Sequence, residues 1–187
     1  MKLEVIIAST RPGRLGDQIG KWFADYAATH SDFEVSVADL AEINLPLFNE
    51  AAHPMTGVYA HDHTKAWSKR IASADAFVVI TPEYNYTMPP ALMNAIDYLN
   101  REWKYKPVGF VGYGIAGGVR AVQAEKLIFA NLSAMPVGPT VSLMGVHRPA
   151  TETYVPEERH EQAADKMLAE LTLWAEALQG MRSRVVS

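Results

Sequence analysis

The sequence predicts an α/β protein with a parallel sheet covered by helices on both faces. Five short apolar runs recur along the chain, each followed by turn residues and then by a segment with helical spacing. Two of the runs, Ala76–Ile80 and Val108–Val111, are continuously apolar, as expected of strands buried on both faces. The 187 residues are 49% hydrophobic and contain no internal repeat or linker, so we expect a single domain that spans residues 1–187.

The other three runs predict strands of different exposure. Leu3–Ala8 is rich in β-branched residues, which favour strands. Phe33–Ala38 alternates apolar with polar residues and indicates a more exposed strand. Val137–Leu143 contains Pro139, which places this strand at or near an edge because proline cannot donate a hydrogen bond to a neighbour.

Helical spacing separates and follows these strands. In the final helix, for example, Ala164, Leu171 and Trp174 belong to one apolar stripe. The expected helices are Gly16–Ala28, Lys65–Ser73, Pro89–Leu99, Gly118–Leu132 and Glu157–Leu178.

Three unusual loops follow the first, third and fourth strands, and parallel sheets bind ligands outside the carboxyl ends of their strands. The first loop runs from Ser9 to Gly16 and combines two hydroxyls and two arginines with a helix start. It matches neither GxxxxGK[ST] nor GxGxxG, so it favours a single phosphate at a helix N terminus. The simpler interpretation is an ordinary turn in which Ser9 or Thr10 caps the helix and the arginines are solvated.

The other two loops suit a flat ligand. "TPEYNYTMPP" is stiffened by three prolines, and its tyrosines would be satisfied by a planar aromatic molecule, or by packing on the protein or on a second subunit. The glycines of "GYGIAGGVRA" would let backbone N–H groups approach a delocalised negative charge, or would simply make a flexible connection.

Composition excludes several classes of function. The net charge of −4 argues against non-specific nucleic-acid binding. The absence of cysteine removes disulfides, thiol nucleophiles and thiolate metal sites, so any redox chemistry needs a bound cofactor. "MKLEVIIAST" is not a signal peptide and no run is long enough to span a membrane, so we expect a cytoplasmic protein. His61, Asp62 and His63 lack an evident third ligand partner, and we expect them to begin the helix that carries Trp67 rather than to bind a metal.

Taken together, "STRPGR", "PEYNYTMP" and "GYGIAGGVRA" resemble the NAD(P)H-dependent FMN reductase family, which includes quinone, azo-dye and chromate reductases. The resemblance extends from Leu3 to about Leu143. It implies a flavodoxin-like three-layer sandwich whose five-stranded parallel sheet has the order 2-1-3-4-5.

The resemblance also implies which residues contact FMN. The phosphate would be held by Ser9, Arg11 and Arg14 and by the amides around Leu15 and Gly16. The isoalloxazine ring would lie along Pro82, Glu83, Tyr84 and Asn85, with Tyr113, Gly114, Gly117 and Gly118 on its other side. Family members often have a serine where this chain has Ile115 and Ala116, so we expect backbone contacts there rather than a hydroxyl contact.

The function implied is an FMN-dependent NAD(P)H oxidoreductase. NADPH or NADH would pass a hydride to flavin N5, and a small acceptor (a quinone, an azo compound, a metal oxyanion or free flavin) would then be reduced in a ping-pong cycle without a firm catalytic side chain. The family is commonly homodimeric or homotetrameric, with the flavin near an interface at the helix that starts at Pro89. Tyr59 and Trp67 of a neighbouring subunit could wall the open side of the pocket.

Two other functions are considered. A flavodoxin-type electron carrier would bind FMN without reacting with nicotinamide, but such carriers tend to be strongly acidic, and this chain has 17 basic residues against 21 acidic ones. The other is a nucleotide-binding or interaction module that binds no flavin.

Overall fold

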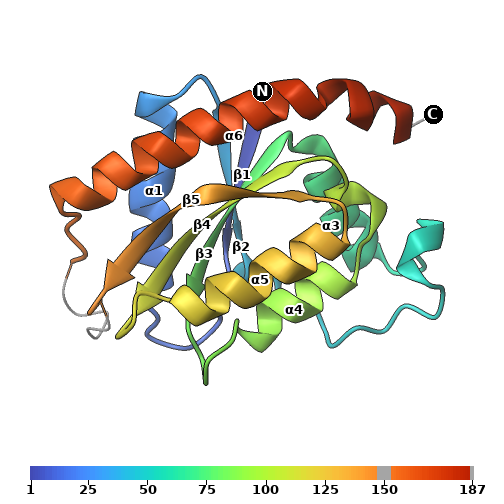
Figure 1. Ribbon diagram of the computed structural model, residues 1–187. Helices are drawn as coiled ribbons and strands as arrows, with labels where there is room; N and C mark the ends of the chain where they lie inside the picture. The colour runs from blue at the N-terminus through green and yellow to red at the C-terminus, as the bar shows by residue number, and fades with distance from the viewer. Residues whose placement is uncertain (147–152, 186–187) are drawn as a thin grey trace.

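The computed structural model describes residues 1–146 and 153–185 and contains a five-stranded parallel sheet between two layers of helices (Figure 1). The strand order is β2-β1-β3-β4-β5, which confirms the predicted order. The strands are β1 (Lys2–Ile7), β2 (Glu34–Asp39), β3 (Ala76–Pro82), β4 (Pro107–Gly114) and β5 (Met135–Met144).

Two hydrophobic clusters, one on each face of the sheet, hold the layers together. On one face, strand residues such as Val78 pack with Phe23 and Leu171 from the first and last helices. On the other face, neighbours such as Val79 pack with residues of the helices between β2 and β5. The helices are α1 (Gly16–His30), α2 (Leu40–Ile43), α3 (Asp62–Ser73), α4 (Pro90–Asp97), α5 (Val119–Asn131) and α6 (Glu158–Val185). This alternation along each strand is what a sheet covered on both faces requires.

The two edge strands have the exposure that the sequence predicted. β2 leaves Glu34, Ser36 and Val37 exposed, whereas β3 is buried along its whole length. β5 lies at the opposite edge, and its register with β4 shifts next to Pro139, where a proline is tolerated.

The helix boundaries differ from the predictions mainly at helix ends. α6 continues past Leu178 to Val185, and α3 begins at Asp62 with His61 at its N-cap, as expected for the His61–His63 segment. Helix α2 and the 3₁₀ turns Pro54–Thr56 and Arg101–Trp103 were not predicted, because elements of one turn show no periodicity in the sequence.

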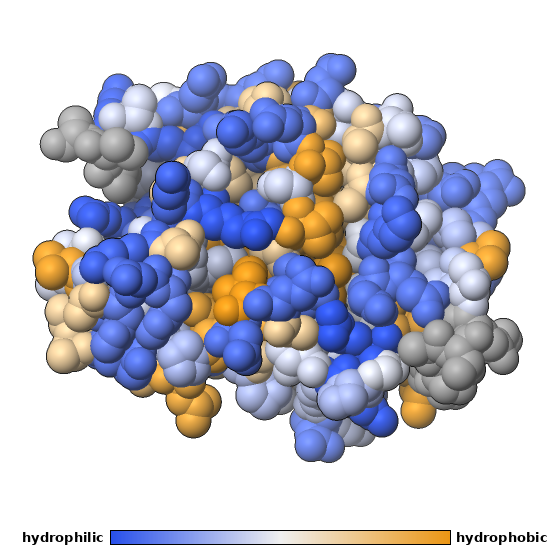
Figure 2. Space-filling model, turned by 180° about the vertical axis from the view of Figure 1, so that it is seen from behind, coloured by the Kyte–Doolittle hydropathy of each residue, from blue (hydrophilic) through white to orange (hydrophobic). Residues whose placement is uncertain are grey.

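The surface is mixed in character. Figure 2 shows the side opposite to that of Figure 1, where hydrophobic residues near the centre are bordered by polar ones. Within the described part of the chain, no helix is long and apolar enough to cross a membrane. Nor do residues 1–146 and 153–185 bring together three or more His, Cys, Asp or Glu side chains that could hold a metal ion.

Candidate functional site

The loops after β1, β3 and β4 meet at the carboxyl end of the parallel sheet, toward which the arrowheads of β3, β4 and β5 point in Figure 1. Side chains join them directly. The hydroxyls of Ser9 and Tyr84 are 2.7 Å apart and share a hydrogen bond between the first and third loops. Tyr113, which comes from the end of β4, also lies close to Ser9 near the start of α1. The sequence predicted that these loops would be neighbours, and the contacts through Ser9 tie them into one unit.

The first loop leads into α1, whose N-cap residue makes no side-chain hydrogen bond, although the Asp17 carboxylate in the first turn accepts one from the Gln18 N–H at 2.9 Å. Leu15 occupies the N-cap of α1, and no side-chain hydrogen bond is made to the first turn from this position. Ser9 is 1% exposed and its hydroxyl is turned to Tyr84, while Thr10 is exposed. The interpretation in which Ser9 or Thr10 caps the helix is therefore wrong. An uncapped helix start with its positive dipole end is a favourable place for an anion.

The two arginines of this loop have different surroundings. Arg14 forms an ion pair with Asp39 at the end of β2, and both side chains are largely buried. The Nε–H of Arg14 is also buried and has no hydrogen-bond partner among the described residues. Arg11 is exposed, and its side chain pairs with none of the residues described. Within residues 1–146 and 153–185, the Arg11 guanidinium is therefore without a partner and the Arg14 Nε–H is without an acceptor.

The loop after β3 is a tight turn with an unusual backbone. Tyr84 and Thr87 exchange two backbone hydrogen bonds of 2.9 and 3.0 Å, and the residues between them, Asn85 and Tyr86, have φ of 49° and 68°. Positive φ at both central positions is characteristic of a type I′ turn, where glycine is usual and tyrosine is strained. Tyr86 is nevertheless 72% exposed. The turn therefore holds an aromatic ring out at the rim of the site.

Glu83 and Arg120 anchor this turn to the start of α5. The Glu83 carboxylate accepts hydrogen bonds from the Arg120 side chain at 2.7 Å and from its backbone N–H at 3.0 Å. Burial alone would raise the pKa of Glu83, but these bonds from Arg120 hold it below its usual value. The Arg120 guanidinium carbon also lies 4.1 Å from the centre of the Tyr86 ring, so it covers one face of that ring.

Most glycines of the loop after β4 are required by close packing within the protein. A Cβ on Gly118, whose φ is +70°, would lie 2.7 Å from the Cα of Gly112, and a Cβ on Gly117 would lie 2.1 Å from the Ser142 hydroxyl. Gly114 differs, because nothing lies within 4 Å of the corresponding position. Of the glycines predicted to line the ring, Gly114 is therefore the one with open space beside it.

Tyr113 is buried rather than displayed. Its hydroxyl would be only 2.8 Å from a Cβ placed on Gly16, so Tyr113 reaches from β4 to the start of α1. Burial and the neighbouring Tyr84 raise its pKa, which keeps the phenol protonated. The Tyr113 side chain therefore packs against the start of α1 and supports the first loop.

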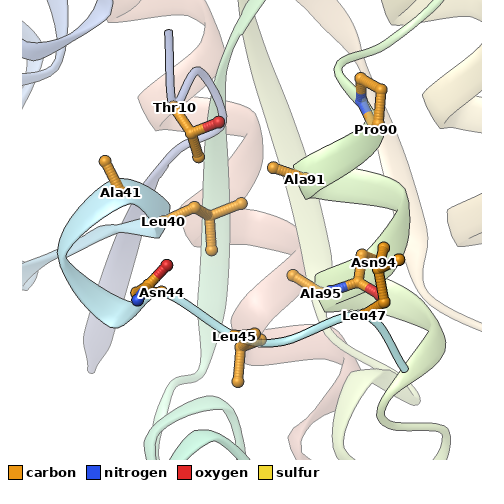
Figure 3. Close-up of a pocket in the computed structure, with 10 residues that line it drawn as sticks. All are labelled: Thr10, Leu40, Ala41, Asn44, Leu45, Leu47, Pro90, Ala91, Asn94 and Ala95. Carbon is orange, nitrogen blue, oxygen red and sulfur yellow. The ribbon is translucent and has the colours of Figure 1, made fainter. Parts of the chain in front are cut away.

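Two cavities flank the first loop. One of about 460 Å³ lies between α2 and α4, where Leu40 and Ala91 face each other and Thr10 stands at its edge (Figure 3). The other, of about 360 Å³, lies beyond the end of β5 and is lined by Leu15 and His160, among others. Of the predicted FMN-binding residues, only Leu15 lines either of these two cavities, and several of the others, such as Ser9, Pro82 and Tyr113, are buried.

Some residues were missed or misjudged in the sequence. Asp39 and Arg120 had no assigned role, although Asp39 directly ends a strand and Arg120 belongs to the "GGVRA" motif. Trp67 cannot wall a neighbouring pocket, because it is 2% exposed and its indole N–H donates to the Ala95 carbonyl at 2.8 Å. Tyr59 is partly buried and donates its hydroxyl proton to Glu102.

This fold defines a flavodoxin-like α/β protein in which the loop before α1 is linked to an aromatic turn after β3. The model of the NADPH-dependent FMN reductase family matches residues 1–148, and the chain belongs to that family. It is accordingly an oxidoreductase, of a family that works with FMN and NAD(P)H.

Individual relatives agree with this placement. The chain is 36% identical over 161 residues to an NAD(P)H-dependent FMN reductase of Schizosaccharomyces pombe, covering 81% of this chain and 80% of the relative. It is 27% identical to a quinone reductase of Escherichia coli, covering 97% and 98%. Among solved structures, the flavoenzyme NAD(P)H:(acceptor) oxidoreductase FerB of Paracoccus denitrificans superposes with a TM-score of 0.74 at 22% identity, covering 94% and 97%, which supports the shared fold.

Proposed function

We propose that this protein holds FMN across the three loops and uses NAD(P)H to reduce a small acceptor, with quinones as the first class to test. The observation that carries the proposal is the start of α1, where Leu15 provides no side-chain cap and where Arg11 and the Arg14 Nε–H have no partners among the described residues. Ser9 connects this loop to the aromatic turn. The relationship to a quinone reductase supports the choice of acceptor.

The first loop fits a monophosphate. Arg11 supplies a positive charge, and the amides around Leu15 and Gly16 are not served by a side-chain cap. The buried Nε–H of Arg14 lacks an acceptor, and a buried donor without an acceptor is costly. A phosphate oxygen would satisfy these donors together with the helix dipole. Ser9, which hydrogen-bonds to Tyr84, would contribute by holding the loop as well as through its hydroxyl.

The other two loops fit a planar ring. Pro82, Glu83, Tyr84 and Asn85 form a rigid segment, held at Tyr84 by Ser9 and at Glu83 by Arg120. Gly114 leaves open space on the opposite side, followed by Gly117 and Gly118 at the start of α5. Backbone groups of both segments would form hydrogen bonds with the edge of the ring. Tyr113 would support the site by packing against the start of α1.

When bound, FMN supplies the redox chemistry by accepting a hydride from NAD(P)H at N5 and returning the electrons to the acceptor in a second half-reaction. The protein's part is to bind and orient. Side-chain hydrogen bonds fix Tyr84 to the first loop and Glu83 to the start of α5, which limits how far this segment can move. We assign no side chain as acid or base.

The test is reduction of the FMN-loaded protein under anaerobic conditions. Mixing with NADPH or NADH should bleach the flavin absorbance, and later addition of a quinone should restore it. A protein that takes up FMN but is bleached by neither nucleotide would be an electron carrier instead. A protein that takes up no FMN would refute the proposal.

We further propose a homodimer or homotetramer with α4 in the interface. Leu47, Phe48 and Met93 are exposed around α4, and Leu47 is 85% exposed. The amide of Asn94 holds the 46–48 segment against α4 through bonds to Pro46 and Phe48. Light scattering should report an oligomer that Met93→Glu disrupts. A monomeric wild-type protein would refute this part.

A further inference from the structure

A glutamate on α5 is buried among apolar side chains, close to the end of β3. Glu125 lies on α5 and is 0% exposed. Val122 and Phe129, one turn away on either side along the same helix, are buried hydrophobic residues of the same face. One carboxylate oxygen lies 2.5 Å from the hydroxyl of Thr81, and the other has no hydrogen-bond partner among the described residues. Nothing in the proposed function uses this group.

No opposite charge among the described residues compensates Glu125. The charged residues nearest to it in sequence on α5 are engaged elsewhere, since Lys126 reaches toward the Gly138 carbonyl and Arg120 pairs with Glu83. Neither β3 nor β5 contains a charged residue, and Asp97 of α4 is on the exposed side of its helix. An ionised carboxylate in such surroundings would be strongly disfavoured.

The hydrogen bonds of Thr81 point to the same protonation state. Its hydroxyl lies within bonding distance of two oxygens, Glu125 Oε1 at 2.5 Å and the Pro82 carbonyl at 3.2 Å. A hydroxyl has one proton to donate, and the Pro82 carbonyl can only accept. Both contacts are hydrogen bonds only if Glu125 donates to Thr81 and Thr81 donates to Pro82.

We propose that Glu125 carries a proton in the folded protein and acts as a positioning residue, fixing the Pro82 carbonyl through Thr81 where β3 enters the FMN-binding segment. The chain of donors ends at a carbonyl oxygen, which has no proton to pass on, so it positions the segment and does not relay protons. The inference rests on the proposed function for the role of Pro82 but not for the state of Glu125.

The electrostatics agree with this geometry. Burial raises the pKa of Glu125 to about 8, with the Thr81 hydrogen bond opposing it. Above that pH the proton is lost, Thr81 has to donate to the carboxylate, and the Pro82 carbonyl loses its bond. A negative charge then also stands behind the segment that borders a ligand whose phosphate is anionic. FMN affinity should therefore fall on the alkaline side.

The experiment compares the full-length wild-type protein with Glu125→Gln, whose amide donates to Thr81 at every pH. Glu176→Gln makes the same chemical change at an exposed position of α6 and is the matched control. Infrared spectra of the FMN-free proteins near neutral pH should show the carbonyl band of a protonated carboxylic acid in wild type and Glu176→Gln. The band should be missing in Glu125→Gln and disappear from wild type above about pH 8. If the band is absent from wild type, or survives in Glu125→Gln, the proposed protonation is refuted.

FMN affinity, measured by quenching of flavin fluorescence, tests the positioning role. Wild type and Glu176→Gln should lose roughly tenfold in affinity relative to Glu125→Gln as the pH rises from about 6 to about 10, equivalent to a coupling of about one pKa unit. Equal pH dependence in all three proteins would refute the positioning role while the infrared band stands. Absence of FMN binding at every pH would refute the proposed function, and with it the positioning role, but would leave the infrared result to decide the protonation of Glu125.

Discussion

Replacing Arg11 by alanine tests the proposed phosphate site most directly, because its guanidinium is exposed and has no partner in the described part of the chain. The guanidinium of Arg11 is exposed and pairs with none of the residues described, so its removal should leave the fold intact. A hydrogen bond to a charged group is worth about 1.5–3 kcal/mol, and solvent screening at an exposed position favours the lower end. The expected loss of FMN affinity is therefore roughly tenfold.

The assay compares FMN with riboflavin, which lacks the phosphate. Arg11→Ala should weaken FMN roughly tenfold and leave riboflavin nearly unchanged, as measured by fluorescence titration at low salt. Lys21→Ala is the control, since it removes an equal charge from an exposed position further along α1. Equal losses for FMN and riboflavin would show that Arg11 does not hold the phosphate.

Arg14→Ala should behave differently from Arg11→Ala. It leaves the buried carboxylate of Asp39 without its partner, which should lower the free energy of unfolding by about 3 kcal/mol. Urea denaturation of the two variants should separate them clearly. An Arg14→Ala protein as stable as wild type would contradict the ion pair as the anchor of the first loop.

Three further predictions concern stability. Gly118→Ala should destabilise the protein by more than the roughly 1–2 kcal/mol that a left-handed alanine costs, because its Cβ would lie 2.7 Å from the Cα of Gly112. Gly13→Ala, with a similar φ and nothing within 4 Å, should show the backbone cost alone, and equal losses in urea denaturation would refute the steric argument. Burial lowers the pKa of Lys106 from 10.5 to about 8, so the unfolded chain binds more protons between these values. Wild type should therefore gain stability relative to Lys106→Met as the pH rises through that window in thermal unfolding, and a constant difference would contradict this. Burial opposes ionisation of Glu50, but hydrogen bonds to its carboxylate lower its pKa from 4.5 to about 2. Its stabilisation relative to Glu50→Gln should be complete above about pH 4.5 and should disappear toward pH 2 in acid unfolding, and a difference that persists at acid pH would speak against it.

Local patterns in the sequence were sufficient for the sheet and for the location of the site. The apolar runs, the helix start at Gly16 and the loop motifs are each contained within a few consecutive residues, so periodicity and composition reveal them. The strand order was implied by the family resemblance, and the structure confirms it.

Contacts between distant residues could not be predicted in this way. The pairing of Arg14 with Asp39 depends on where β2 ends beside the first loop, and that of Thr81 with Glu125 depends on how α5 packs on β3. The left-handed Tyr86 is opposed by local preferences, since such positions favour glycine, and only the surrounding contacts hold it there. These are the features that give the candidate site its charge distribution and its rigidity.

The uncapped start of α1 has a practical consequence for anyone who purifies this protein. Any small oxyanion that binds the folded chain at that helix start, but not the unfolded chain, stabilises the fold by an amount that rises with the logarithm of its concentration once this exceeds the dissociation constant. Phosphate or sulfate buffers would therefore raise the apparent melting temperature. They would also compete with FMN for the proposed phosphate-binding site. Affinities measured in such buffers would be underestimates, and a zwitterionic buffer is the appropriate medium for the titrations described above.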